Sequence, residues 1–103
     1  MNDLDPVIHA TTRLRIMTAL KPLGLDDKIA FNALAHSLGL TPGNLSVHLT
    51  KLADAGYVAI EKTFERRKPA TYVALTPQGR AAFEQYLLDL RALLAGAPTD
   101  PGA

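Results

Sequence analysis

Residues 38–75 read LGLTPGNLSVHLTKLADAGYVAIEKTFERRKPATYVAL, and this stretch decides the fold. Thr41-Pro42 is typical of a helix start, because the threonine oxygen caps free amides and proline has no amide hydrogen to leave unbonded. Gly56 is typical of the left-handed residue that ends a helix. Beyond it, apolar residues alternate with polar ones on both sides of a basic segment. The stretch therefore predicts a helix followed by a β-hairpin.

The same capping device recurs at Asp5-Pro6 and Thr76-Pro77, so helices are expected to begin there as well. The predicted fold class is α+β, mostly α, with a small antiparallel hairpin and a long C-terminal helix. The expected elements besides the hairpin are a first helix from Pro6 to Leu20, a short strand over Lys28–Phe31, a short helix from Ala33 to Leu38 capped by Asn32 and stopped by Gly39, a central helix from Pro42 to Ala55 and a last helix from Pro77 to Leu94.

The composition favours one compact domain. Of the 103 residues, 48% are apolar, which is enough for one core but not for two. We expect residues 1–95 to form the domain and residues 96–103 to be a disordered tail. Cysteine is absent, which excludes disulfides and thiolate metal sites. The sequence shows neither an export signal nor a membrane-spanning run, so a cytoplasmic location is expected.

The central helix, residues 42–55, has two contrasting faces. Leu45, Leu49 and Leu52 recur at helical spacing and are expected to be buried. The opposite face carries mostly short side chains, which allow a helix to approach base edges in the major groove of DNA. On that ground we predict DNA contacts from the following residues of this helix and its cap: Thr41, Gly43, Asn44, Ser46, Val47, His48 and Lys51.

The hairpin, residues 62–71, concentrates positive charge at its tip. The net charge of the whole chain is only +1, but residues 41–72 hold five basic side chains against three acidic ones. A run of cations repels itself and gains nothing from packing, whereas contact with phosphates releases counterions and adds affinity for any duplex. Pro69 is expected to stiffen the tip. The predicted phosphate contacts are Lys62, Arg66, Arg67 and Lys68.

Several segments resemble those of the winged helix-turn-helix transcriptional regulators of the MarR and ArsR kind, and most closely the short, single-domain winged helix DNA-binding proteins. They are RLRIMTAL at 13–20, LAHSLGLT at 34–41, NLSVHL at 44–49, LADAGYV at 52–58, the basic hairpin and LTPQGR at 75–80. The resemblance extends over residues 6–95. It implies a homodimer that binds a pseudo-palindromic operator and usually represses transcription.

Each predicted DNA contact also has a structural explanation. Asn44 fits bidentate contact with adenine, but asparagine near a helix start is also a solvated capping residue. His48 lies nearest the leucine stripe and fits a half-buried packing role equally well. Thr41 is first a cap, and a charge run such as residues 66–68 is usually a solvated surface. The position of that run on a hairpin beside the helix favours the DNA interpretation.

The first and last helices carry more apolar residues than a small monomer needs to cover its core. We therefore expect a homodimer, because one such domain contacts too little DNA for useful specificity. Its two recognition helices would lie about 34 Å apart, one turn of DNA. The alternative is that both helices simply wrap the core. The predicted dimer contacts are Val7, Ile8, Ile16, Leu20, Phe83, Tyr86, Leu87, Leu90 and Leu94.

Other functions have less support in the sequence. The three histidines fall on separate elements without carboxylate partners at metal-ligand spacing, and no phosphate loop or nucleophile motif is present, so neither a cofactor nor an enzymatic activity is expected. A small-molecule effector between the first and last helices would follow from the MarR resemblance. The main competing hypothesis is a winged helix that binds protein, which would carry apolar residues where residues 66–68 are basic. RNA binding is disfavoured, since no aromatic stacking platform is evident.

Overall fold

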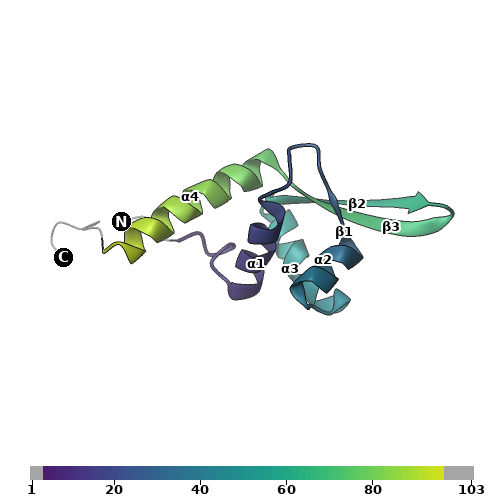
Figure 1. The fold of residues 1–103 in the computed structure, drawn as a ribbon, viewed down its shortest axis with the longest axis horizontal. Helices are drawn as coiled ribbons and strands as arrows, with labels where there is room; N and C mark the ends of the chain where they lie inside the picture. The colour runs from purple at the N-terminus through teal and green to yellow at the C-terminus, as the bar shows by residue number, and fades with distance from the viewer. Residues whose placement is uncertain (1–3, 97–103) are drawn as a thin grey trace.

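The computed structural model describes residues 4–96 and shows four helices with a three-stranded antiparallel sheet (Figure 1). The predicted α+β class, the short third strand and the bounds of the last helix are confirmed. Residues 97–103 of the predicted tail lie outside the described residues. In chain order the elements are α1 (Thr11–Leu20), β1 (Ile29–Ala30), α2 (Phe31–Leu38), α3 (Pro42–Asp54), β2 (Val58–Glu65), β3 (Lys68–Leu75) and α4 (Pro77–Leu94).

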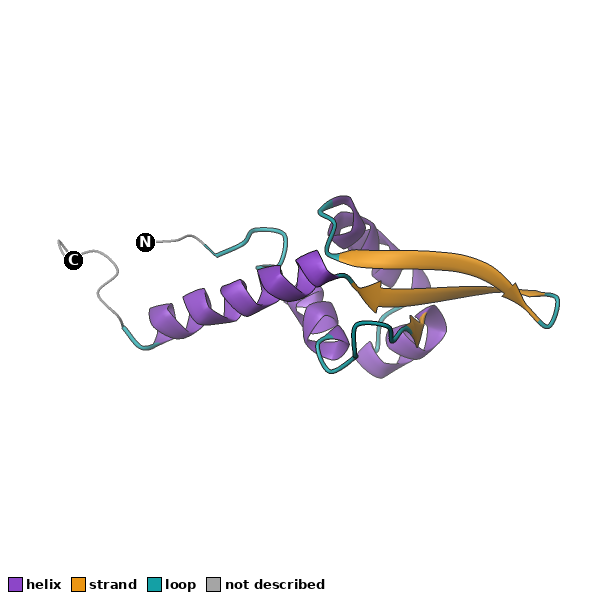
Figure 2. Ribbon diagram, turned by 90° about the horizontal axis from the view of Figure 1, so that it is seen from above, coloured by secondary structure: helices purple, strands orange, loops and turns teal. Residues whose placement is uncertain are grey.

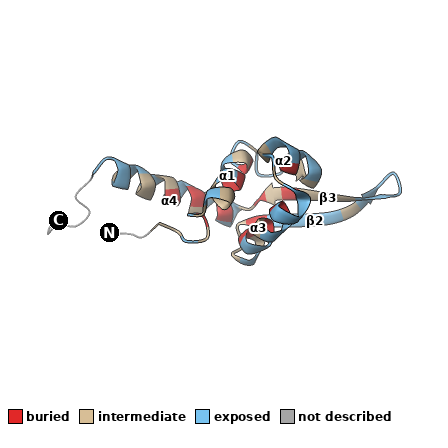
Figure 3. Cartoon of the chain, turned by 90° about the horizontal axis from the view of Figure 1, so that it is seen from below, coloured by how far each residue is buried: buried red, intermediate tan, exposed pale blue. Residues whose placement is uncertain are grey.

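The core lies where α1, α2 and α3 meet the root of the β2–β3 hairpin (Figure 3). From this core the outer part of the hairpin and the far end of α4 project in opposite directions (Figures 1 and 2). The leucine stripe predicted for α3 is buried there, as expected from its helical spacing. The most deeply buried side chains are Ile8, Ile16, Met17, Leu20, Leu34, Leu45, Leu49, Leu52, Val73, Phe83 and Tyr86.

The hairpin ends in a two-residue turn. β3 lies between β1 and β2, and β2 and β3 remain paired along their whole lengths, so that only Arg66 and Arg67 form the turn. Both arginines have left-handed backbones, with φ of 50° and 66°, where turns of this length favour asparagine and glycine. Pro69 is therefore not at the tip, as predicted, but within β3 opposite Phe64, because pairing continues to the turn.

The predicted caps of α3 and α4 are confirmed. Thr41 Oγ1 accepts a hydrogen bond from the Asn44 amide at 3.2 Å, and Thr76 Oγ1 accepts one from the Gly79 amide at 2.9 Å. In both helices a proline follows the cap, where its missing amide hydrogen leaves no acceptor unsatisfied. These two local signals fix the starts of the helices that flank the hairpin.

Two other predicted caps are wrong. α2 begins directly after β1, so Asn32 lies inside its first turn and provides no cap. α1 begins at Thr11 rather than at Pro6, because Arg13 Nε donates to the Val7 carbonyl oxygen at 2.6 Å, where a continuous helix would place a backbone amide. Asp5 instead stabilises a separate turn, in which its Oδ1 accepts from the Val7 amide at 2.8 Å.

The junction between α3, the hairpin and α4 is closely packed around Gly79. Thr76 Oγ1 donates to the Gly56 carbonyl oxygen at 2.6 Å, and the Thr76 amide donates to the Tyr57 carbonyl oxygen at 3.1 Å. Gly79 is buried against this same Tyr57 carbonyl, and a Cβ at position 79 would lie only 2.0 Å from its oxygen. This junction therefore sets the direction in which α4 leaves the core.

Tyr57 also links the hairpin root to the N-terminal turn, since its hydroxyl donates to Asp5 Oδ2 at 2.5 Å. This hydrogen bond, followed by burial, raises the pKa of Tyr57 from 10.0 to about 12. Because the folded pKa lies above the unfolded one, the resulting stability is complete below pH 10.0 and is lost as the pH rises toward about 12.

We expect Tyr57→Phe to lower the free energy of unfolding by about 1 kcal/mol at neutral pH, because it removes the hydrogen bond to Asp5. The variant should then lose less stability than the parent protein as the pH passes from 10.0 to about 12. Urea unfolding curves measured at several pH values in this range test the prediction. Equal pH dependence in the two proteins would contradict it.

Candidate nucleic-acid interface

The outward face of α3 presents the predicted contact residues in a row. Gly43, Asn44, Ser46 and Lys51 are exposed, and so is the Thr41 cap. The largest apolar side chain of this face, that of Val47, is 56% exposed, although nothing in the core requires it to be there. A short, mostly polar helix face above a leucine stripe is the profile of a helix that enters the major groove.

His48 differs from the other predicted contacts, because it is only half-buried and turned toward α1. Its Nδ1 lies 3.3 Å from Arg13 Nη1, the same arginine whose Nε is bonded to the Val7 carbonyl. Burial lowers the pKa of His48, and the neighbouring charges of Arg13 and Lys51 lower it further. His48 is thus held neutral beside α1, in the packing position that the sequence left open. Sequence reasoning missed Arg13, whose partner lies 35 residues away.

The two faces of the hairpin differ in charge. We call the face that packs toward α2 and α3 the inner face; beyond the core it presents Lys62, Phe64, Pro69 and Thr71. The opposite, outer face carries the acidic residues of the wing. The inner face, across residues 58–75, therefore carries a cation and no carboxylate.

The carboxylates of the outer face are paired by neighbouring side chains. Lys28 Nζ lies 2.6 Å from Glu61 Oε2 and 4.4 Å from the centre of the Tyr72 ring. The Tyr72 hydroxyl in turn donates to Glu65, and these interactions with the carboxylates raise the pKa of both Lys28 and Tyr72. Lys68 pairs with Glu65 across the strands, so this predicted phosphate contact belongs to the outer face.

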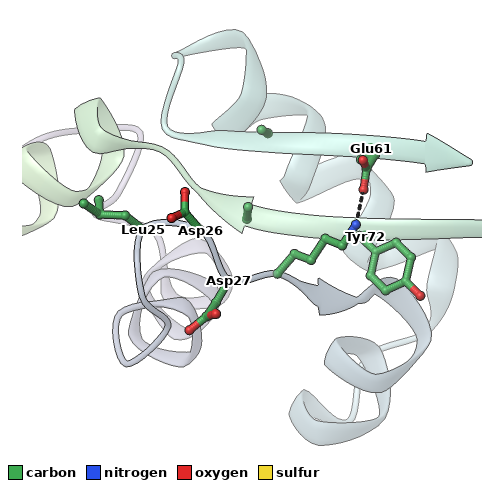
Figure 4. Close-up of a pocket in the computed structure, with 8 residues that line it drawn as sticks. Leu25, Asp26, Asp27, Glu61 and Tyr72 are labelled. Atoms are coloured by element: carbon green, nitrogen blue, oxygen red, sulfur yellow. Dashed lines mark hydrogen bonds and ion pairs between the residues drawn. The ribbon is translucent and has the colours of Figure 1, made fainter.

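An open cavity of about 340 Å³ lies on the outer side of the sheet (Figure 4). Its rim contains Asp26, Asp27 and Glu61, with the Lys28–Glu61 ion pair beside Tyr72. Three carboxylates around one cavity repel a phosphate backbone. The outer side is therefore unsuited to nucleic acid, which leaves the inner face and α3 as the candidate interface.

A groove of about 230 Å³ separates α3 from the inner face of the hairpin. Its walls bring together three hydroxyls and one ammonium group, the kinds of group that hydrogen-bond to phosphate oxygens. The lining residues are Phe31, Ser46, Leu49, Thr50, Ile60, Lys62 and Thr71. Sequence reasoning missed Thr50 and Thr71. Thr50 follows Ser46 by one helical turn and donates to its carbonyl at 2.9 Å, and Thr71 is identified only by its pairing with Lys62.

Comparison with known proteins places the chain in a family. A sequence model described as the winged helix DNA-binding domain matches residues 12–94, which include every helix and strand of the structure. The chain belongs to the winged helix DNA-binding domain family. In the terms of that family, α3 is the recognition helix and the β2–β3 hairpin is the wing.

Relatives of this winged helix protein come from several organisms. It is 32% identical over 84 residues to the uncharacterized protein MJ0432 of Methanocaldococcus jannaschii, covering 82% of this chain and 88% of the relative. It is also similar to a solved structure of a transcriptional regulator homologue from Pyrococcus horikoshii, with 33% identity, a TM-score of 0.79, and coverage of 87% and 86% of the two chains. Reduced HlyU from Vibrio cholerae aligns with 25% identity and a TM-score of 0.60, over 77% of this chain and 76% of its own.

The structure divides the predicted dimer contacts into two groups. Ile8, Ile16, Leu20, Phe83 and Tyr86 lie in the core of the single winged helix domain and have no surface left for a partner subunit. Their burial follows from the separate N-terminal turn, which places Ile8 over the core. Val7, Leu87 and Leu90 are half-buried, and Leu94 is 75% exposed. α4 also exposes two leucines that the prediction did not include, Leu88 and Leu93.

Two further searches were confined to the described part of the chain. Across residues 4–96, no three His, Cys, Asp or Glu side chains are grouped so as to hold a metal ion. Within the same residues, no helix combines the length and apolar character needed to cross a membrane.

Proposed function

We propose that this protein is a homodimeric transcriptional repressor that binds a pseudo-palindromic DNA operator. The observation that carries the proposal is the one-sided charge of the wing. Its carboxylates are paired on the outer face, whereas the inner face joins α3 across a groove lined with hydroxyl and ammonium groups. A surface with this arrangement is complementary to a phosphate backbone flanked by two grooves. Chromosomal DNA as the partner places the protein in the cytoplasm.

In the proposed complex, each part of the surface has a different role. The exposed face of α3 enters the major groove, where Asn44 lies in the first turn and contacts base edges. The phosphates of one strand lie along the groove between Ser46 and Lys62. Arg66 and Arg67 at the wing tip contact phosphates beside the adjacent minor groove, and both occupy a left-handed backbone that arginine does not favour. Such strain is typical of positions that function maintains.

Two alanine variants separate base reading from phosphate binding. We expect Asn44→Ala to weaken binding to the preferred operator by about 1–3 kcal/mol and to relax the base preference at one position. Arg67→Ala should weaken binding to all duplexes alike and reduce the salt slope by about 0.9. Fluorescence anisotropy on operator and scrambled duplexes at several salt concentrations measures both effects. If Arg67→Ala bound every duplex with the parent's affinity and slope, the wing would not contact phosphate.

The dimer in this proposal forms through the projecting end of α4. Leu88, Leu93 and Leu94 are 57%, 44% and 75% exposed in the single chain, and a second α4 would cover them. Two recognition helices related by the resulting two-fold axis would read half-sites one DNA turn apart. An effector that acts on the dimer has a candidate location in the hollow of about 370 Å³ between Lys21 and α4.

We expect the double substitution Leu93→Glu/Leu94→Glu to weaken dimerisation by about 3 kcal/mol, because it places two carboxylates on the apolar contact. Both side chains are exposed in the single chain, so the fold should persist. Sedimentation equilibrium should show dimers for the parent protein and monomers for the variant. Leu25→Glu, at a leucine that is 64% exposed on the outer side of the sheet, is the matched control and should remain dimeric. A monomeric parent protein would contradict the dimer.

One observation favours a second candidate function, a wing that binds another protein. Phe64 is 73% exposed near the wing tip, and an exposed aromatic side chain is typical of protein interfaces. The basic turn beside it and the polar groove behind it favour DNA. Binding of duplex DNA by the parent protein decides between the two functions.

A further inference from the structure

Phe64 is the large apolar side chain that the fold uses least. It lies on the inner face of the wing, opposite Pro69 and one residue pair from the turn, and 73% of it is exposed. Ile60, on the same face but nearer the core, is 37% exposed because α3 covers it. Nothing in the fold therefore accounts for an aromatic ring at the far end of the wing.

The surroundings of Phe64 show what kind of surface it meets. Lys62 precedes it on the same face, and Arg66 and Arg67 follow it in the turn, so the ring is flanked by cations along the wing. The carboxylate of Glu65 points to the other face, where Tyr72 donates to it. The minor groove of DNA has the complementary pattern, because its sugar walls and base edges are less polar than the two rows of phosphates beside them.

We propose that Phe64, backed by Pro69, is an apolar wedge that enters the minor groove beside the recognition site and bends the duplex. This inference rests on the proposed DNA-binding function and adds a second mode of recognition to it. A minor groove about 6 Å wide cannot admit a two-stranded wing bearing a phenyl ring unless the groove opens. Apolar side chains open it by partly unstacking a base step, which kinks the duplex toward the major groove.

A wedge of this kind selects sequence without hydrogen bonds. Pyrimidine–purine steps such as TA unstack most easily, so operators with such a step under the wing are bound more tightly than operators with a stiff A-tract there. The preference arises at a position that α3 does not contact. It depends on the ring of Phe64 and not on the charges of Arg66 and Arg67, which bind any duplex.

The test is the end-to-end distance of a bound duplex, measured by energy transfer between dyes at its two ends. The duplex, of about 30 base pairs, is taken from the genomic fragment that the parent protein binds most tightly. The parent protein should shorten the distance, and Phe64→Ala should bind about tenfold more weakly, in the range of one lost aromatic–base contact, with an unchanged salt slope and little shortening. Phe64→Trp should restore the bend.

Leu25→Ala is the matched control, because Leu25 is also an exposed apolar residue but lies on the outer side of the sheet. It should bend DNA as the parent protein does. If Phe64→Ala bound and bent the duplex like the parent, or if the parent bound without bending it, the wedge would be wrong and the DNA-binding function would stand. If the parent protein bound no duplex at all, the proposed function itself would fail.

Discussion

Gly79→Ala is expected to destabilise the fold by about 3 kcal/mol, the upper end of the effect of overpacking a buried site. The added methyl group would lie 2.0 Å from the Tyr57 carbonyl oxygen, 2.7 Å from its carbon and 2.8 Å from its Cα. These are backbone atoms, so no side-chain rotation relieves the contact. The Tyr57 carbonyl also accepts from the Thr76 amide, and moving it breaks the hydrogen bond that joins the hairpin to α4.

Thermal unfolding should show this effect as a fall of about 12–24 °C in Tm for a domain of this size. Gly43→Ala is the matched control, because a Cβ at position 43 would have no atom within 4 Å and the residue has an ordinary helical backbone. That variant should be as stable as the parent or more stable by about 0.5–1 kcal/mol. Equal Tm values for the two variants would show that the junction is not packed as described.

Reversing the charge of the wing tip should have the largest effect on DNA binding. We expect Arg66→Glu/Arg67→Glu to weaken binding to every duplex by about 100-fold at 0.15 M salt, because two phosphate contacts are lost and repulsion replaces them. The slope of log affinity against log salt should fall by about 2. Both side chains are exposed at the turn, so the core is not disturbed.

The same turn provides a control that separates charge from fold. Arg66→Asn/Arg67→Gly places the residues that a left-handed two-residue turn prefers at these positions. The variant should be slightly more stable than the parent protein and yet bind DNA about 30-fold more weakly at 0.15 M salt. Anisotropy titrations together with urea unfolding measure both properties. Parent-like affinity in the uncharged variant would mean that the arginines serve neither DNA nor the turn.

The parts of the fold that the sequence predicts correctly depend on local signals. Thr41-Pro42 and Thr76-Pro77 each determine a helix start within a few residues, and alternation fixes the register of the hairpin. The start of α1 could not be predicted in this way, because Arg13 takes the Val7 carbonyl through a side chain rather than through the helix pattern. Helical periodicity by itself extends the helix back to Pro6.

Contacts distant in sequence also limited the prediction of the site. The sequence lists the charges of the wing, but not the side on which each lies: Lys28 reaches Glu61 over 33 residues and fixes the outer face. Similarly, apolar periodicity identifies Ile16 and Leu94 as equal candidates for a dimer contact. Only the packing of the chain shows that the first is fully buried and the second 75% exposed.

The central claim, that the protein reads a specific duplex sequence as a dimer, is tested most directly by incubating it with fragments of its source genome and sequencing those it retains. The account predicts strong enrichment of a few fragments that share a pseudo-palindrome, with half-sites about 10–10.5 base pairs apart centre to centre. Asn44→Ala should lose this enrichment while still retaining DNA. Retention of fragments in proportion to their abundance, or of none, would contradict the account.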